Sequence, residues 1–241
     1  DKINFVVPSG NFGNILAAYY ACRMGLPIKQ LIVASNKNNV LTDFFESGEY
    51  NINREFHKTI SPSMDILISS NLERLLYELG DRDEKFVIEL IDDLKKSGRY
   101  EVKEEKLGEK FPQFFAYYAN EAETYEVIDN FFDEYNYLLD PHTAVGMSVF
   151  FKYMSETFDV DTPTVIVSTA SPFKFPQDVF YALTKNREDN PIKSIKRLQT
   201  YSAIKAPEEI IELDRKQILH DFVIPKSEIK NTILDLFERK K

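Results

Sequence analysis

The chain has 241 residues, of which 43% are apolar and 13% aromatic, so it is long enough to bury a hydrophobic core. Its 30 Lys and Arg stand against 39 Asp and Glu, and the net charge of -9 argues against a general polyanion binder, because nucleic-acid affinity depends on basic side chains that displace counterions. No apolar run is long enough to cross a bilayer, and the one cysteine, Cys22, excludes an intrachain disulfide framework. We therefore expect a cytoplasmic protein without nucleic-acid or membrane partners.

The first residues predict a strand, a loop and a helix. A β-branched and aromatic run at 3–7 is followed by a loop at 8–14 and by a helix at 15–24, which Gly25 ends. A second strand at 28–34 completes a βαβ unit, which favours a parallel sheet. Because the first strand starts without a lead-in, we expect the chain to begin within a domain.

The middle of the chain predicts helices. A short helix is expected at 40–47, and a longer one at 61–79 with Leu72, Leu75, Leu76 and Leu79 on one face. Residues 81–139 are rich in charge and have apolar residues at helical spacing, which is typical of a solvated amphipathic insertion. Asn120 and Glu123 are spaced as a capping box at the start of its last helix.

The last third of the sequence predicts a further helix and a further strand of the sheet. Asp140 and Pro141 start a helix that runs to about Tyr153, and a strand follows at 164–168. The remaining expectations are a helix at 176–184, an edge strand at 197–201 and a terminal amphipathic helix at 227–239. The sequence thus predicts a three-layer α/β fold with a mostly parallel sheet, formed by 1–80 and 140–241, with a helical insertion at 81–139.

A glycine-containing loop, Pro8-Ser9-Gly10-Asn11-Phe12-Gly13-Asn14, joins the first strand to the first helix. Ligands of open α/β sheets bind at such a junction, and the first amides of a helix attract anions. The loop lacks a lysine and is neither a Walker loop nor a dinucleotide fingerprint. An anion site is one interpretation, and a plain tight turn is the other.

Four blocks of this sequence resemble the threonine synthases of the long bacterial and fungal type. They occur in the order of that family: the loop just described with Met24-Gly25-Leu26-Pro27 and Ala34-Ser35-Asn36; Met64-Asp65 with Asn71 and Arg74; Asp140-Pro141-His142-Thr143-Ala144-Val145-Gly146; and Thr169-Ala170-Ser171-Pro172-Phe173-Lys174-Phe175. The similarity extends over most of the chain and corresponds to the C-terminal part of the family.

The resemblance implies a pyridoxal-phosphate (PLP) enzyme of fold type II, like the tryptophan synthase β subunit. Enzymes of that family are lyases that convert O-phosphohomoserine and water to L-threonine and phosphate. In that family the cofactor phosphate would be surrounded by Gly10, Asn11, Phe12, Gly13 and Asn14, and Thr169 would hydrogen-bond the pyridine nitrogen. Taken without the family, Thr169 is equally a turn-forming hydroxyl at a strand end.

The lysine that forms the family's Schiff base lies upstream of the phosphate loop, outside this sequence. We therefore expect that no catalytic residue of that kind is present, that an N-terminal half completes the cofactor domain, and that the isolated chain is inactive. Lys174 follows the pyridine-nitrogen threonine and is not expected at the aldehyde; it is either a surface residue or a substrate contact. Ser171 replaces the histidine that is usual in the family.

Other candidates have simpler interpretations beside the functional ones. Arg74, three residues after Asn71, either binds a substrate anion or forms a surface ion pair. His142, near a helix start, is interpreted as a packing or capping residue, and Cys22 as a small core residue. Neither a metal-binding spacing nor a G-x-S-x-G elbow occurs in the sequence.

Two alternatives to a threonine synthase remain open from the sequence. One is another fold-type-II enzyme, such as a threonine dehydratase-like protein, against which the His142 block and the insertion argue. The other is a catalytically inactive homologue that binds PLP or a phospho-amino acid.

Overall fold

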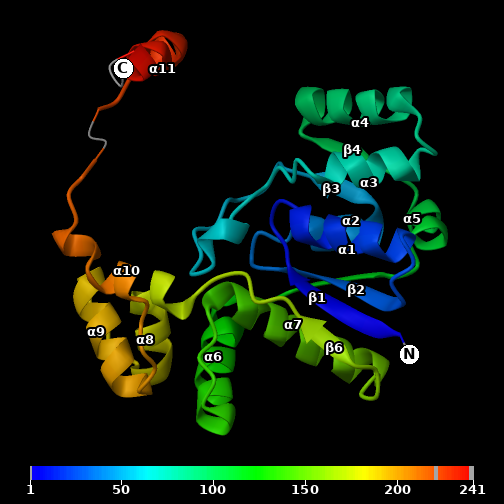
Figure 1. Ribbon diagram of the computed structural model, residues 1–241. Helices are drawn as coiled ribbons and strands as arrows, with labels where there is room; N and C mark the ends of the chain where they lie inside the picture. Colours follow the sequence, from blue (N-terminus) through cyan, green and yellow to red (C-terminus); the bar gives the residue numbers. More distant parts are fainter. Residues whose placement is uncertain (1, 220–221, 239–241) are drawn as a thin grey trace.

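A four-stranded parallel sheet lies at the centre of the protein, with the strand order β5-β2-β1-β6 (Figure 1). The computed structural model describes residues 2–219 and 222–238. The strands of this sheet are β1 (Ile3–Pro8), β2 (Ile28–Ser35), β5 (Phe114–Tyr118) and β6 (Thr164–Ile166). All three strand pairs are parallel, which confirms the α/β fold with a parallel sheet.

Side chains of β1 and β2 alternate between two buried clusters, one on each face of the sheet. Val7, Leu31 and Val33 belong to the larger cluster, whereas Val6, Ile32 and Ala34 belong to the smaller one. Successive side chains of a strand point to opposite faces, so two hydrophobic layers must cover these strands. The larger cluster contains residues of α1 (Gly13–Arg23) and α2 (Val40–Ser47), and the smaller one contains residues of α7 (Pro141–Thr157), which gives the three layers.

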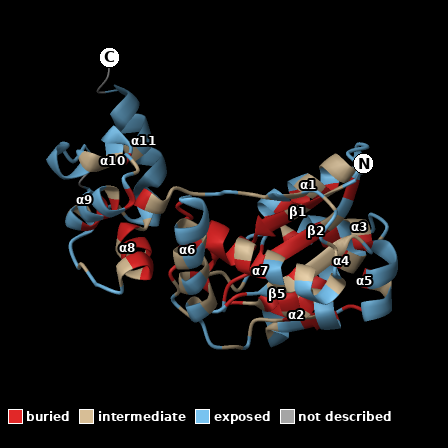
Figure 2. Cartoon of the chain, turned by 90° about the horizontal axis from the view of Figure 1, so that it is seen from below, coloured by how far each residue is buried: buried red, intermediate tan, exposed pale blue. Residues whose placement is uncertain are grey.

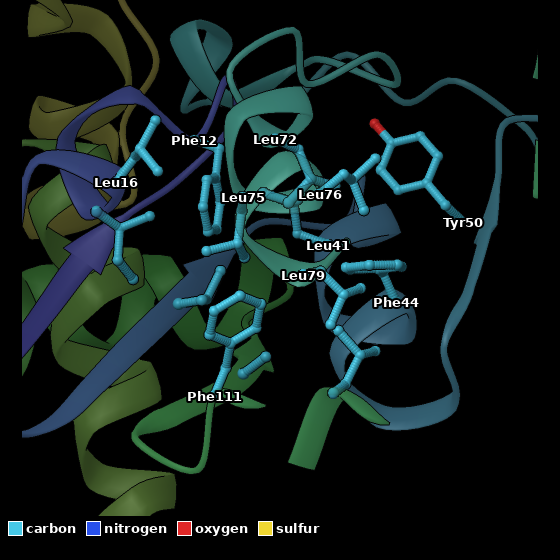
Figure 3. Close-up of a cluster of buried hydrophobic side chains, with 14 of the residues drawn as sticks. Phe12, Leu16, Leu41, Phe44, Tyr50, Leu72, Leu75, Leu76, Leu79 and Phe111 are labelled. Carbon is cyan, nitrogen blue, oxygen red and sulfur yellow. The ribbon is translucent and has the colours of Figure 1, made fainter. Parts of the chain in front are cut away.

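The larger cluster extends beyond the sheet into a group of helices and a small antiparallel ribbon. The added elements are β3 (Glu49–Asn51), α3 (Leu72–Leu79), α4 (Glu84–Ser97), β4 (Arg99–Glu101) and α5 (Glu104–Lys110). Leu72, Leu75, Leu76 and Leu79 form the buried face of α3, as their helical spacing predicts (Figure 3). Cys22 is partly buried and packs against the same cluster.

A second helical group lies beside the sheet (Figure 1). It contains α6 (Glu121–Tyr135), α8 (Pro176–Thr184) and α9 (Pro191–Ser202), which share one buried cluster. Beyond it the chain includes α10 (Glu208–Ile211) and α11 (Ile229–Glu238), and α11 has no buried residue (Figure 2). The described part of the chain has no helix that combines the length and the apolarity needed to cross a membrane.

The expected helix at 61–79 is wrong in its first half. Only a 3-10 turn, η1 (Pro62–Met64), and α3 are helical, and the chain between them is irregular. The Asp65 carboxylate accepts hydrogen bonds from the Thr59 amide at 2.9 Å and from the Asn36 and Asn38 side chains at 2.8 and 3.0 Å. The bond from the Thr59 amide is a side-chain bond to nearby backbone, which competes with a helix, and local propensity does not reveal it.

The expected edge strand at 197–201 is also wrong, because these residues lie within α9. Ser194, Ile195, Leu198 and Ser202 are buried at helical spacing, and the Asn190 side chain caps the helix by accepting from the Lys193 amide at 2.9 Å. The terminal helix at 227–239 is present as η4 (Lys226–Glu228) and α11, although Arg239 lies outside the described residues.

The range 81–139 is not wholly helical, which corrects the expected helical insertion. It contains α4, α5 and α6, but also β4 and the strand β5, which pairs with β2 in the central sheet. The capping box at Asn120 and Glu123 is confirmed. The strand was missed because Phe114 to Tyr118 is a continuous run of aromatic residues and alanine, and such a run does not show the alternation typical of a half-exposed strand.

Two substitutions on α4 test the extent of the larger core. Leu90 is 7% exposed and Ile88 is 56% exposed. We expect Leu90→Ala to lower the free energy of unfolding by about 2–5 kcal/mol, because it leaves a cavity in the core. Ile88→Ala is the matched control and should change it by less than about 0.5 kcal/mol. Urea denaturation followed by circular dichroism measures both, and equal effects would contradict the assignment of α4 to the core.

Candidate functional site

The loop between β1 and α1 is fixed by the side chain of Phe12. This side chain is 1% exposed and stacks on Phe45 and Phe114, with ring centroids 5.9 Å apart in both pairs. Phe12 itself has a φ of 63°, in the left-handed region that residues other than glycine rarely adopt. The buried ring therefore holds a tight turn directly before the helix, and Phe12 offers only its backbone to a ligand.

Polar side chains of residues 69–71 hold the carbonyl groups of this loop. The Ser69 hydroxyl donates to the Gly10 carbonyl, and the Asn71 side-chain amide donates to the Asn11 carbonyl at 2.8 Å. The Asn11 side chain accepts from the Ser70 amide at 2.7 Å and from the Ser70 hydroxyl at 2.9 Å. The two segments are therefore joined by hydrogen bonds from three consecutive residues.

These bonds determine where the amides of the loop point. In a trans peptide the carbonyl and the following N–H point in opposite directions, so the amides of Asn11 and Phe12 face away from residues 69–71. The Phe12 carbonyl accepts from the Leu16 amide at 3.1 Å, which turns the Gly13 amide outward from the helix start. Within the described residues, no backbone amide from Gly10 to Asn14 finds an acceptor. The loop thus offers several unpaired donors to one side.

Gly10 lies against the backbone of the 3-10 turn η1. A Cβ atom at this position would be 2.8 Å from Met64 Cα and 3.2 Å from the Ser63 carbonyl oxygen. Both contacts are with backbone, which cannot move away as a flexible side chain can. Only glycine allows this approach.

His142 connects the turn η1 to the start of α7. Its ring is buried, with Nδ1 3.0 Å from an Asp140 carboxylate oxygen, and Nε2 accepts from the Ser63 amide at 3.1 Å. Because Nε2 accepts a hydrogen bond, Nδ1 carries the proton and donates it to Asp140. His142 thus fixes the position of the turn that contacts Gly10, which goes beyond the packing or capping function expected for it.

Asp140 caps α7 and orients His142 at the same time. Its carboxylate accepts from the His142 amide at 2.9 Å and from the Thr143 hydroxyl. Burial raises the pKa of Asp140, but the hydrogen bonds from His142 and Thr143 outweigh burial and hold its pKa below the ordinary value. The carboxylate is therefore ionised at neutral pH.

The loop, the turn η1, His142 and Thr169 line one cavity of about 230 Å³. Gly10, Asn11, Phe12, Gly13 and Asn14 all contribute to its wall, so the structure brings these residues and Thr169 together. Thr169 is exposed three residues after β6, and its hydroxyl forms no hydrogen bond with any described residue. No Asp, Glu, Lys or Arg is among the described residues that line the cavity. The donors offered to a ligand are neutral backbone amides and hydroxyl groups.

The two expected substrate contacts are not brought to this cavity. Arg74 is exposed on α3, and Lys174 is exposed in the 3-10 turn η2 (Pro172–Lys174), with Nζ 5.9 Å from the centroid of the Phe175 ring. Neither residue lines the cavity, and the binding function of both stays a prediction. The Ser171 hydroxyl caps η2 by accepting from the Phe173 amide at 3.3 Å.

Sequence reasoning missed the residues that support the loop. Ser63, Ser69 and Ser70 belong to no recognisable motif. Their contacts join residues that are 59 or 79 positions apart in the chain. A run of Ser-Ser-Asn directly before a helix is a weak signal for side chains that bond to backbone, but it does not reveal which backbone.

Comparisons with known proteins identify the family. A family model described as the C-terminal part of threonine synthase matches residues 143–223. The threonine synthase of Pseudomonas aeruginosa is 41% identical over 178 residues, which cover 74% of this chain and 37% of the relative. The chain belongs to the threonine synthase family. The curated threonine synthases and threonine synthase-like proteins that it matches are longer, and the chain spans between 27% and 41% of their length.

Solved threonine synthases have the same fold. The yeast enzyme superposes with a TM-score of 0.84 at 33% identity, over 99% of this chain and 48% of that protein. The PLP-bound threonine synthase of Brucella melitensis has a TM-score of 0.71 at 41% identity, over 83% of this chain and 42% of that protein. The resemblance to threonine synthases expected from the sequence, and the fold of that family, are therefore confirmed.

The lowered pKa of Asp140 leads us to expect that the stability of the protein depends on pH. Its pKa is lower in the folded protein than in the unfolded chain. Asp140 therefore stabilises the folded protein at pH values above the unfolded pKa of about 3.9, and this stabilisation is lost as the pH falls through the pKa of the folded protein. We expect Asp140→Asn to be less stable than the unmodified chain at pH 7, and the difference to shrink at acidic pH. Urea denaturation at several pH values measures it.

Asp161→Asn, which changes an exposed carboxylate on another segment, is the control for the loss of one negative charge. A difference between Asp140→Asn and the unmodified chain that stays constant down to pH 3 would contradict the stabilising hydrogen bonds of Asp140.

Proposed function

We propose that the chain holds the phosphate and the ring nitrogen of PLP in a threonine synthase that converts O-phosphohomoserine and water to L-threonine and phosphate. One observation carries the proposal: unpaired backbone amides of the loop and the free hydroxyl of Thr169 line the same cavity. The family membership and the PLP-bound relative from Brucella melitensis support it.

The loop suits a phosphate group for reasons of charge and space. Backbone amides at a helix start carry partial positive charge, and the helix dipole adds to it, so a dianion is favoured there. Because Gly10 has no side chain, its backbone can lie against Met64 and form part of the cavity wall. Since no carboxylate lines the described cavity, nothing there repels the anion.

Thr169 suits the ring nitrogen because its hydroxyl is neutral. A hydroxyl can donate to the pyridine nitrogen without favouring its protonation, whereas a carboxylate would stabilise a pyridinium cation. When bound, the cofactor supplies an electron sink for the substrate carbanion. The residues of this chain would bind its two polar ends and fix the orientation of the ring between them.

The lysine that attaches the cofactor is proposed to belong to the part of a longer threonine synthase that this chain does not span. None of the described residues that line the cavity is a lysine, and Lys174 lies away from it. The chain alone would then bind the cofactor weakly, through its phosphate and ring nitrogen.

The first prediction uses pyridoxine 5′-phosphate, which lacks the aldehyde and therefore does not react with surface lysines. We expect Asn71→Asp to weaken its binding at least about tenfold, because the aspartate cannot donate to the Asn11 carbonyl and brings a negative charge close to the phosphate. Phosphorus NMR of the ligand measures the affinity.

Asn53→Asp is the matched control, since the Asn53 amide also donates to a backbone carbonyl, that of Ser97 at 2.8 Å, on another part of the surface. It should leave the affinity unchanged. Pyridoxine without the phosphate should bind more weakly than the phosphorylated form. Equal binding of the two compounds, or equal effects of the two substitutions, would overturn the phosphate site.

The second prediction concerns turnover. We expect the 241-residue chain with PLP and O-phosphohomoserine to release no phosphate above the rate without protein. A longer form that includes the upstream region of a threonine synthase should release it. Phosphate release by the chain alone at an enzymatic rate would show that the lysine outside the chain is not required.

A further inference from the structure

A second cavity, of about 370 Å³, lies between α3, α4 and the ribbon of β3 and β4. Its apolar wall includes Leu72 and Leu76 of α3 and Ile91 and Leu94 of α4. Figure 3 shows Leu72 and Leu76 on the side of α3 that lies next to Tyr50. Cavities of this size and apolarity are typical of sites for small molecules.

Two stacked tyrosine rings form part of the wall, and one of them has an unused hydroxyl. Tyr50 and Tyr100 lie with centroids 5.0 Å apart and an interplanar angle of 4°. The Tyr50 hydroxyl donates to the Leu67 carbonyl at 2.9 Å and accepts from the Ser69 amide at 2.8 Å. Tyr100 is only 5% exposed, yet its hydroxyl forms no hydrogen bond with the described part of the chain. The Tyr100 hydroxyl is therefore free to contact a ligand in the cavity.

One acidic and one basic side chain also line this cavity, on different helices. Glu73 belongs to α3 and forms no ion pair with a described residue. Lys95 belongs to α4, where its only ion pair within the described ranges is a 3.6 Å contact with Asp92 between two well-exposed side chains. Exposed pairs of this kind contribute little, so both charges are available to a ligand.

We propose that this cavity binds a free α-amino acid with an apolar side chain. The apolar wall would take the side chain, Lys95 the carboxylate and Glu73 the ammonium group, with the Tyr100 hydroxyl as a further polar contact. A neutral apolar molecule would contact neither charge, and a ligand with a single charge would contact only one of them. The combination of an apolar wall with one charge of each sign therefore fits a zwitterion.

Ligand binding at this cavity is coupled to the first site through Tyr50 and Ser69. The Tyr50 ring lines the cavity and its hydroxyl accepts from the Ser69 amide, while the Ser69 hydroxyl donates to the Gly10 carbonyl. Ser70, which also lines the cavity, bonds to the Asn11 side chain. An amino acid that packs on Tyr50 and Leu72 would stabilise the arrangement in which the loop amides face the cofactor phosphate. The amino acid would thus raise the affinity for that phosphate, and this part rests on the proposed function.

The probe is L-leucine, titrated into the 241-residue chain by calorimetry. We expect saturable binding to one site per chain. Two analogues test the recognition of both charges: 4-methylpentanoate lacks the ammonium group, and 3-methylbutylamine lacks the carboxylate. Both should bind at least about tenfold more weakly than leucine. Absence of leucine binding, or equal affinity for the three compounds, would overturn the proposal.

Substitutions on one helix locate the site. Lys95→Met should weaken leucine binding about tenfold, whereas Lys96→Met, one residue further along α4, should not. Ile91→Trp should abolish binding by filling the cavity, whereas Ile88→Trp, at an exposed position on the same helix, should leave it unchanged. Equal effects within either pair would overturn the location. If Ile91→Trp prevents folding, the comparison of Lys95→Met with Lys96→Met still tests the location.

A separate experiment tests the coupling between the two sites. Saturating leucine should lower the dissociation constant of pyridoxine 5′-phosphate by about fivefold or more, and by reciprocity the phosphate compound should tighten leucine binding by the same factor. Leucine binding without this effect would overturn the coupling and leave the amino-acid site. If pyridoxine 5′-phosphate does not bind at all, the proposed function fails, while the leucine titration still decides the second site.

Discussion

The hydrogen bonds from residues 69–71 to the loop after β1 are the constraint on which the site depends. By occupying the carbonyls of Gly10 and Asn11, Ser69 and Asn71 leave the amides of the same peptides without an internal partner. An isolated loop would satisfy these amides with water or with its own carbonyls. Here the buried Phe12 ring and the supporting side chains prevent both carbonyls from turning, so the amides are directed in advance toward an anion.

The same arrangement explains why distant segments converge on one small cavity. The turn η1 contacts Gly10, and His142 and Asp140 hold that turn from the start of α7, on the other face of the sheet from α1. Thr169 arrives from β6, the strand next to β1. Because the loop and Thr169 both follow neighbouring parallel strands, their positions at one edge of the sheet result from the fold itself. The site therefore requires the sheet and the helices on both of its faces.

The amino-acid site proposed for the second cavity would give these supporting residues a further function. Tyr50 connects its aromatic wall to Ser69, so the side chains that position the loop between β1 and α1 would also contact the proposed amino acid. Coupling of this kind requires only that one segment be ordered by two ligands, and no large movement is needed. The segment before α3 is suited to it, because its structure depends on side-chain hydrogen bonds more than on a regular helix.

The sequence alone determined the parallel α/β sheet, the β1–loop–α1 junction and the helices α1, α2, α7 and α8, because hydrophobic period, caps and glycines act over a few residues. Its ordered motifs also identified the family and the residues of the loop. Only the tertiary structure decided that β5 enters the sheet, that 197–201 is helical, that Arg74 and Lys174 lie away from the cavity, and that Ser69 to Asn71 support the loop. These features depend on contacts between residues far apart in the chain, and such contacts outweigh local preferences that differ by only a fraction of a kcal/mol per residue, on the order of 0.5.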